Sequence, residues 1–205
     1  MADTVILFQD DFQSFPIGPL PFDREHSAMG EYHYSPLPGY RGQWYDPIAN
    51  CNYRGPSWLV TATDGVHYME QTRVRNPLTH GVCPVLATGE EHWQDYTFTV
   101  TLRTLCSNEE AGVLFRYQTS LMHYAFFMND NKVQFWRIEK KERTMLAEAP
   151  YEYNCDQYYT MRVTCKGNTF TGSINGEKLL TVQDDRYTYG TVALAAFMPT
   201  QYTNV

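Results

Sequence analysis

The sequence lacks several patterns that mark common classes of protein. No stretch approaches the roughly 18 consecutive apolar residues of a membrane-spanning helix, and no window keeps helical apolar spacing for three turns. The start, Met1 to Phe8, has neither the basic region nor the long apolar region of a signal peptide. The net charge is −7 and no run of like charges occurs, so we expect neither nucleic acid nor a membrane as a partner.

Local motifs for metal binding and nucleophilic catalysis are also absent. The five cysteines are an odd number without a C-x-x-C pair, and the six histidines form neither H-x-H nor H-E-x-x-H. No G-x-S-x-G elbow or glycine-rich phosphate loop is present. The local sequence therefore supports no zinc site, disulfide framework or nucleotide site. Cys165 shares strand parity with Met161 and Val163, so we expect it to be buried.

Aromatic residues, in contrast, are abundant: 16 Tyr, 11 Phe and 4 Trp in 205 residues. They can fill one core and leave rings over for a binding surface. We therefore expect residues 1–205 to form a single domain. The last residues, 201–205, are typical of the first half of a strand, so we expect this domain to belong to a longer protein. Removal of a leader would favour an extracellular or cell-surface location, and a cytoplasmic location stays open.

Period-two alternation of apolar and polar residues predicts strands throughout the chain. In residues 96–103 the apolar members Tyr96, Phe98, Val100 and Leu102 form the expected core face. Residues 159–166 alternate in the same way, and Asn175-Gly176 between two further runs predicts a tight type I′ hairpin. Other strand-like runs are 4–8, 58–62, 67–71, 82–87, 112–117, 123–128, 133–138, 145–149, 177–182 and 191–197.

So many short strands without a helix predict an all-β fold. Each strand must bury one face, which a two-sheet sandwich or a closed barrel can do. At this length we favour the antiparallel sandwich. A long loop, about 19–57, interrupts the rhythm with six of the eleven prolines and six Tyr or Trp residues. Because disordered segments are poor in aromatics, we expect this loop to be ordered and packed by its own rings over a sheet face or rim.

Four segments resemble the concanavalin A-like lectin/glucanase superfamily, in the LamG-like branch that includes 3-keto-disaccharide hydrolase-type domains and carbohydrate-binding modules. They are residues 10–21, 111–118, 133–138 and 189–194. The resemblance implies a jelly-roll sandwich, and it implies a carbohydrate ligand. Relatives often carry a structural calcium between an early acidic residue, matched here by Asp11, and an acidic residue where this chain has Thr203. Asp11 is therefore a candidate calcium ligand in a weakened site.

Paired catalytic carboxylates are not evident. The glucanase branch places acidic residues at alternate positions of one strand, in an E-x-D-x-x-E pattern that this chain lacks. The adjacent pairs Glu90-Glu91, Glu109-Glu110 and Asp184-Asp185 would diverge on a strand, and each occupies a predicted turn. We expect them to be solvated loop charges.

Rings and guanidinium groups remain as candidate sugar contacts. Sugars stack an apolar C–H face on Trp or Tyr, and their polar groups suit a planar Arg fork. Arg116 and Arg137 each interrupt an apolar run, and we expect them to flank Tyr124 on a concave sheet face. An ordinary exposed face is the alternative for both. The full candidate set is Arg41, Trp44, Tyr45, Trp93, Arg116, Tyr124 and Arg137.

Three functions compete at this point. The sequence favours a noncatalytic carbohydrate-binding domain attached to a carbohydrate-active enzyme. The first alternative is a glycoside hydrolase or polysaccharide lyase of the same sandwich fold, because a lyase can use Tyr, His and Arg instead of paired acids. The second is a structural domain without a ligand.

Overall fold

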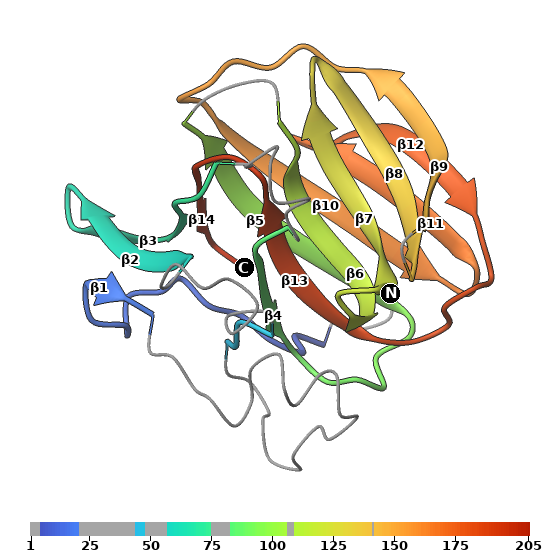
Figure 1. The fold of residues 1–205 in the computed structure, drawn as a ribbon, viewed down its shortest axis with the longest axis horizontal. Coiled ribbons are helices and arrows are strands. Elements are labelled where there is room, and N and C mark those ends of the chain that lie inside the picture. The colour runs from blue at the N-terminus through green and yellow to red at the C-terminus, as the bar shows by residue number, and fades with distance from the viewer. Residues whose placement is uncertain (1–4, 21–43, 48–56, 75–82, 106–108, 141) are drawn as a thin grey trace.

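The structure is a computed structural model that describes residues 5–20, 44–47, 57–74, 83–105, 109–140 and 142–205. These residues form fourteen strands, and no helix occurs among them (Figure 1). The described part of the chain thus contains no helix that could cross a membrane. The predicted all-β class is confirmed.

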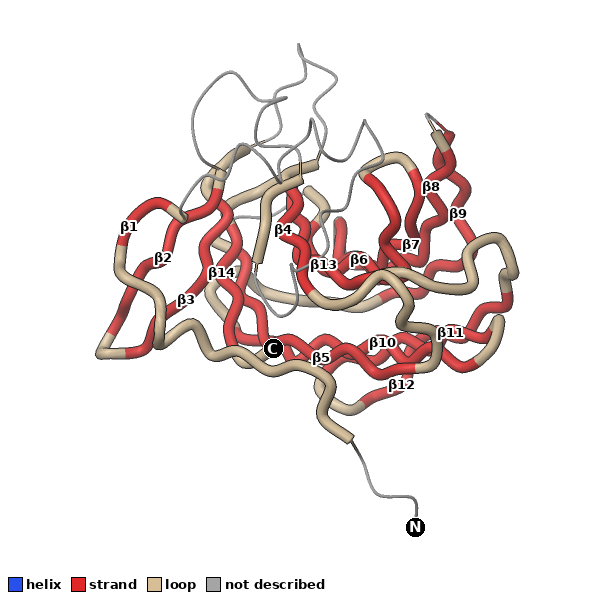
Figure 2. The backbone as a smooth tube through the Cα atoms, turned by 90° about the horizontal axis from the view of Figure 1, so that it is seen from below, coloured by secondary structure: helices blue, strands red, loops and turns tan. Residues whose placement is uncertain are grey.

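The strands form two antiparallel sheets that stack face to face (Figure 2). In spatial order, the eight-stranded sheet consists of β1 (Gly18–Pro19), β2 (Trp58–Thr63), β3 (Val66–Gln71), β14 (Thr200–Thr203), β5 (Tyr96–Thr104), β10 (Tyr158–Lys166), β11 (Thr169–Ile174) and β12 (Glu177–Gln183). The six-stranded sheet consists of β4 (Val85–Thr88), β13 (Thr191–Ala196), β6 (Ala111–Thr119), β7 (Met122–Asn129), β8 (Lys132–Glu139) and β9 (Glu142–Pro150). This is the predicted sandwich.

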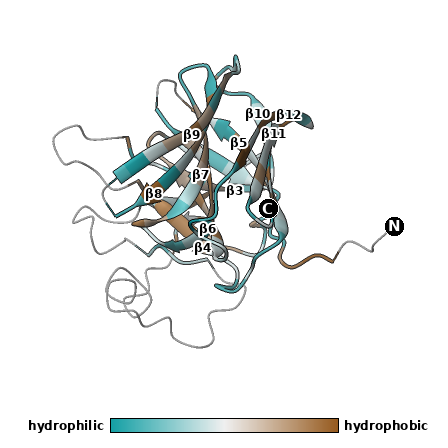
Figure 3. Cartoon of the chain, turned by 90° about the vertical axis from the view of Figure 1, so that its right-hand side faces the viewer, coloured by the Kyte–Doolittle hydropathy of each residue, from teal (hydrophilic) through white to brown (hydrophobic). Residues whose placement is uncertain are grey.

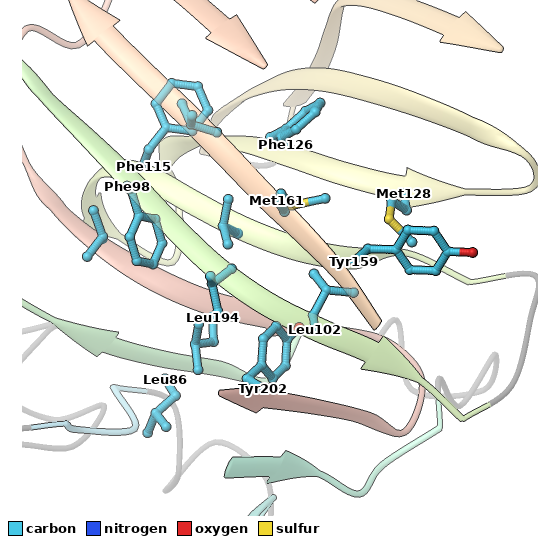
Figure 4. Packing of buried hydrophobic residues seen from close by; sticks show 14 of the residues in the cluster. Leu86, Phe98, Leu102, Phe115, Phe126, Met128, Tyr159, Met161, Leu194 and Tyr202 are labelled. Atoms are coloured by element: carbon cyan, nitrogen blue, oxygen red, sulfur yellow. The ribbon is translucent and has the colours of Figure 1, made fainter. Parts of the chain in front are cut away.

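The main core lies between the two sheets. Tyr96, Phe98, Val100 and Leu102 are all buried there, so the core face predicted for β5 is confirmed. Figure 4 shows Phe98, Leu102 and Met161 of the eight-stranded sheet packing near Phe115 and Phe126 of the six-stranded sheet. Cys165 on β10 is also buried, as predicted. Alternation works for this sheet because one face meets the core and the other meets solvent.

The hairpin between β11 and β12 has the predicted geometry. Ile174 pairs with Glu177, which leaves Asn175 and Gly176 as the two-residue loop. Both loop residues have positive φ, 51° and 84°. These are the dihedral signs that a type I′ turn requires.

In the N-terminal part, one sequence expectation is wrong and another falls mostly outside the described residues. Residues 5–8 form no strand, and Val5, Ile6 and Leu7 are exposed along the hydrophobic segment that leads to the N-terminus in Figure 3. Without a partner strand the alternation there has no ladder to join. Most of the long loop, including residues 21–43 and 48–56, lies outside the described residues, as does Arg41.

The six-stranded sheet is buried on both faces at its centre. Its outer face carries a second hydrophobic cluster: Val85, Ala87, Leu114, Tyr117, Ala125, Phe127, Ala193 and Ala195, with Tyr45, Cys83, Trp136 and Ile138 packed against it. In Figure 2 this sheet is curved, with β4 and β9 rising on either side of β13, β6 and β7. The outer face is therefore concave.

Candidate functional site

Arg116 lies inside the sandwich, 1% exposed. The β6–β7 register shifts after Phe115, and Arg116 has a positive φ of 44° at this irregularity. Its guanidinium donates to the carbonyls of Tyr187 (2.8 Å), Gly167 (2.5 Å) and Gln94 (3.4 Å), and lies 5.0 Å from the Phe170 ring centroid. The prediction that Arg116 faces a ligand is therefore wrong, because the bulge turns its side chain into the core.

Tyr124 and Arg137 also do not lie on the predicted ligand face. They pair in register on β7 and β8, and Tyr124 belongs to the main core between the sheets. Asp184 joins them: its Oδ1 accepts from the Tyr124 hydroxyl and its Oδ2 from Arg137 Nη1, each at 2.5 Å. Burial, and then the bond to Asp184, raises the pKa of Tyr124. This network closes one edge of the sandwich, so the solvated role expected for Asp184 is also wrong.

The aromatic candidates separate into core and outer-face residues. Trp44 is buried, packs on Phe8 and Phe12, and donates from Nε1 to Asp10 Oδ2 at 2.8 Å, so it is a packing residue. Trp93 packs against the main core. Tyr45 forms an isolated bridge with Ala87 and packs on the outer-face cluster. Of the predicted aromatics, Tyr45 alone lies on the concave face.

Asp11 lies beside the end of the last described strand, because Asp10 and Val205 exchange backbone hydrogen bonds at 2.9 Å. The Asp11 carboxylate is exposed and accepts from the amide of Gln13 at 3.0 Å. Nowhere in the described residues do three His, Cys, Asp or Glu side chains gather to hold a metal. The acidic ligands that calcium prefers are therefore not assembled around Asp11 among the described residues.

Polar side chains that were not among the predicted ligand contacts meet at the outer face of the six-stranded sheet. Glu110, just before β6, has a side chain only 4% exposed, and its Oε1 accepts from Arg143 Nη2 at 2.5 Å. Arg143 on β9 is 35% exposed, and its guanidinium lies 4.4 Å from the Trp136 ring centroid. Glu110 Oε2 is buried and has no hydrogen-bond partner among the described residues. An acidic, a basic and an aromatic group thus form one contiguous unit, which we call the Glu110–Arg143–Trp136 cluster.

An amide chain extends this cluster along β8 and β9. Trp136 Nε1 donates to Gln134 Oε1 at 3.1 Å, and Gln134 Nε2 donates to Glu148 Oε2 at 3.3 Å. Lys132 Nζ lies 3.3 Å from Glu148 Oε1. The bonds from Gln134 and Lys132 lower the pKa of Glu148. These bonds therefore fix the orientation of the Trp136 indole and of the Gln134 side-chain amide in the absence of a ligand.

His123 is the buried titratable group next to the cluster. It pairs with Ile138 on the outer face, its ring lies 5.5 Å from that of Tyr117, and its Nδ1 is 3.0 Å from the Thr119 carbonyl. Burial lowers its pKa to about 4, and the charge of Arg143 acts in the same direction. The imidazole is therefore neutral at neutral pH, and the Thr119 carbonyl requires the proton on Nδ1.

The sequence contained one unused signal for this face. Residues 111–115 and 123–128 are nearly continuous apolar runs, which is typical of strands buried on both faces and not of strands with one solvated face. Glu110 was expected to be a solvated turn charge, and that expectation is wrong, since its carboxylate is buried against Arg143. No local pattern joins Glu110 to Arg143, because the sheet brings them together across two intervening strands.

Comparison with known proteins defines the class of this β-sandwich. A family profile described as "3-keto-alpha-glucoside-1,2-lyase-like domain" matches residues 38–204. The chain belongs to this family, and thereby to the concanavalin A-like superfamily that the sequence resembled. No curated protein matches the sequence significantly.

Solved structures with the same fold include carbohydrate-related proteins. The carbohydrate-binding module CBM66 from Bacillus subtilis aligns with a TM-score of 0.59 and 14% identity, over 73% of this chain and 93% of that one. The Bacteroides ovatus protein titled xyloglucan PUL GH43B aligns with a TM-score of 0.56 and 13% identity, over 98% of this chain and 39% of that one. The GH43 protein BlXynB from Bacillus licheniformis aligns with a TM-score of 0.53 and 15% identity, over 71% of this chain and 33% of that one. The chain thus spans well under half of the two GH43 proteins, and at these identities the likeness shows the fold alone.

Proposed function

We propose that this domain binds carbohydrate without turning it over, and that the ligand contacts the concave outer face of the six-stranded sheet. The observation that carries the proposal is the Glu110–Arg143–Trp136 cluster, where a buried carboxylate oxygen has no partner among the described residues. A sugar hydroxyl can accept from the Arg143 guanidinium, which is 35% exposed and is held in place by the Glu110 carboxylate, and such a bond to a charged group contributes about 1.5–3 kcal/mol. The fold shared with CBM66 supports the same ligand class.

The surrounding side chains suit a hydroxyl-rich ligand. Arg143 offers guanidinium donors, and the Gln134 and Trp136 side chains are held by the amide chain described above. Met145, which pairs with Trp136 and is exposed, adds an apolar edge for the C–H face of a sugar ring. Because Glu110 and Arg143 neutralise each other, the face favours a neutral sugar over a strongly charged one.

A second candidate function, sugar elimination or hydrolysis, is favoured by the same carboxylate. Elimination α to a carbonyl needs one base to remove a proton and a cation to stabilise the oxyanion, and Glu110 and Arg143 are groups of these types. Glycoside hydrolysis usually needs a second carboxylate about 5–9.5 Å away. Elimination needs only one carboxylate and one cation, and this cluster contains both, so elimination is the stronger form of this alternative. The family description also points to a lyase.

Binding and turnover can be separated with one set of variants. A glycan array followed by calorimetry on the best ligand should detect binding, and reducing-end and unsaturated-product assays should remain at background. Glu110→Gln and Arg143→Ala should each weaken binding by about tenfold or more. Glu152→Gln removes an exposed charge elsewhere and serves as a matched control. Product formation that Glu110→Gln abolishes would establish the enzyme instead, and unaltered binding in both cluster variants would remove this face from the proposal.

A further inference from the structure

The outer face of the eight-stranded sheet carries a second ordered row of polar and aromatic side chains. Strand register places Tyr158, Arg103, Gln201 and Glu70 side by side on β10, β5, β14 and β3. Arg103 Nη2 donates to Gln201 Oε1 at 2.6 Å, and Gln201 Nε2 donates to Glu70 Oε2 at 2.8 Å. Thr61 on β2 donates to the same Glu70 oxygen at 3.0 Å. Hydrogen bonds therefore fix this row across the sheet.

An exposed tyrosine forms one end of the row. The Tyr158 ring stacks on that of Tyr68 with centroids 6.0 Å apart and planes 20° apart, and the Arg103 guanidinium lies 5.0 Å from its centroid. Tyr158 nevertheless remains 44% exposed. Burial and the hydrogen bond with Tyr68 raise the pKa of Tyr158 to about 12, so its hydroxyl stays a proton donor at any physiological pH. The neighbouring row adds the hydroxyls of Thr101 and Thr160, which pair with each other.

We propose that this Tyr158 row is a second carbohydrate-contact surface, specific for neutral oligosaccharides. The Tyr158 ring would stack on the C–H face of a sugar, while Arg103, which Gln201 holds in place, and the threonine hydroxyls bond its hydroxyl groups. The inference rests on the proposed carbohydrate function and adds a site that acts independently of the Glu110–Arg143–Trp136 cluster.

The composition of the row decides the ligand class. Glu70 balances the charge of Arg103 through Gln201, so the row offers no net charge to an anionic sugar or nucleic acid. A stable protein interface buries a largely apolar centre within more than about 1,000 Å². Here two rings lie among threonine hydroxyls, with Tyr68 itself buried. A hydroxyl-rich saccharide chain therefore fits this surface better than a protein does.

The position of the row has a functional consequence. The outer faces of the two sheets point in opposite directions (Figure 2). One molecule could therefore hold two separate polysaccharide chains, because both surfaces are available at the same time. Two sites on one module raise the apparent affinity for a dense polysaccharide well above that of either site.

A nuclear magnetic resonance titration tests the inference. We would add xylohexaose, cellohexaose or laminarihexaose to ¹⁵N-labelled domain and map the amide shifts. We expect two groups of shifts, one on the six-stranded sheet and one on β10, β5 and β14. Tyr158→Ala should weaken the second group by about tenfold and leave the first unchanged, while Arg143→Ala should do the reverse. Tyr189→Ala removes an equally exposed tyrosine, also 44%, and should alter neither group.

The outcomes distinguish this inference from the proposed function. Shifts confined to the six-stranded sheet would overturn the second surface and leave the proposed function standing. Shifts absent with all three saccharides, and with the best ligand from the glycan array, would overturn both. The mapping on the unaltered domain gives this answer even if Tyr158→Ala does not fold. Tyr158→Phe keeps the ring and should retain most of the binding, and a complete loss in that variant would contradict the stacking role.

Discussion

At the scale of single residues, charged side chains in this sandwich have two opposite roles. Arg116 is enclosed by backbone carbonyls and an aromatic ring, whereas Arg143 extends over Trp136 and remains partly exposed. Arg116 interrupts an apolar run in the sequence, whereas Arg143 precedes the predicted run 145–149. Burial, and not residue type, determines which of them is available to a ligand.

Arg116 should therefore be a stability residue. Arg116→Ala leaves the carbonyls of Tyr187 and Gly167 without their donor and opens a space beside Phe170. We expect the free energy of unfolding to fall by about 3 kcal/mol or more, as for other disrupted buried charge networks. Chemical denaturation measures this loss. A variant with unaltered stability but lost sugar binding would contradict the structure and restore the ligand role.

His123 should make stability depend on pH. Its pKa is about 4 in the fold, against about 6.5 in an unfolded chain, so the unfolded state binds more protons between these values. The free energy of unfolding therefore keeps its full value above pH 6.5. It falls by about 3 kcal/mol in total as the pH decreases from 6.5 toward 4. Denaturation midpoints between pH 4 and 7 should show this slope. His123→Gln should flatten the slope, whereas replacing the exposed His92 should not.

At the scale of elements, the hairpin of β11 and β12 offers the sharpest test of turn chemistry. Gly176 has a φ of 84°, and a Cβ built there meets no atom within 4 Å. Gly176→Val should therefore destabilise through backbone strain alone, by about 1–2 kcal/mol. Thr181→Val on β12 is a matched control, since it introduces the same side chain at an exposed strand position. Equal denaturation midpoints for the two variants would rule out the positive-φ assignment.

Strands β5 and β10 of the eight-stranded sheet could be predicted well because each has one buried face and one more exposed face. The period-two pattern of β5 and β10 reports directly on the core, and Asn175-Gly176 encodes its own turn. The candidate site was predicted poorly because it depends on distant pairing. The bulge that turns Arg116 inward and the contact between Glu110 and Arg143 are set by register between strands, which no local window contains.

At the scale of the whole molecule, Tyr202 couples the two sheets. It lies on β14 of the eight-stranded sheet, and its buried hydroxyl shares its one proton between the carbonyls of Ala195 (2.9 Å) and Gly112 (3.2 Å) on the six-stranded sheet. Tyr202→Phe should lower the free energy of unfolding by about 1–2 kcal/mol.

The form of the unfolding curve is the more informative measurement for this variant. If the sheets unfold together, the midpoint should fall while the denaturant slope stays unchanged. Tyr189→Phe, at an exposed position, should leave both values unaltered. A second transition in Tyr202→Phe would show instead that the sheets unfold independently.

The central place of β14 also affects how the domain is made. β14 joins β3 to β5, although both of those strands are synthesised roughly a hundred or more residues earlier. While a ribosome extends the chain, the meander from β6 to β9 can pair as soon as it emerges, because its contacts are local. The edge of β3 that pairs with β14 stays unpaired until β14, the final described strand, has been synthesised. We expect β3 to be the segment most exposed to proteases and to nonspecific strand pairing during synthesis.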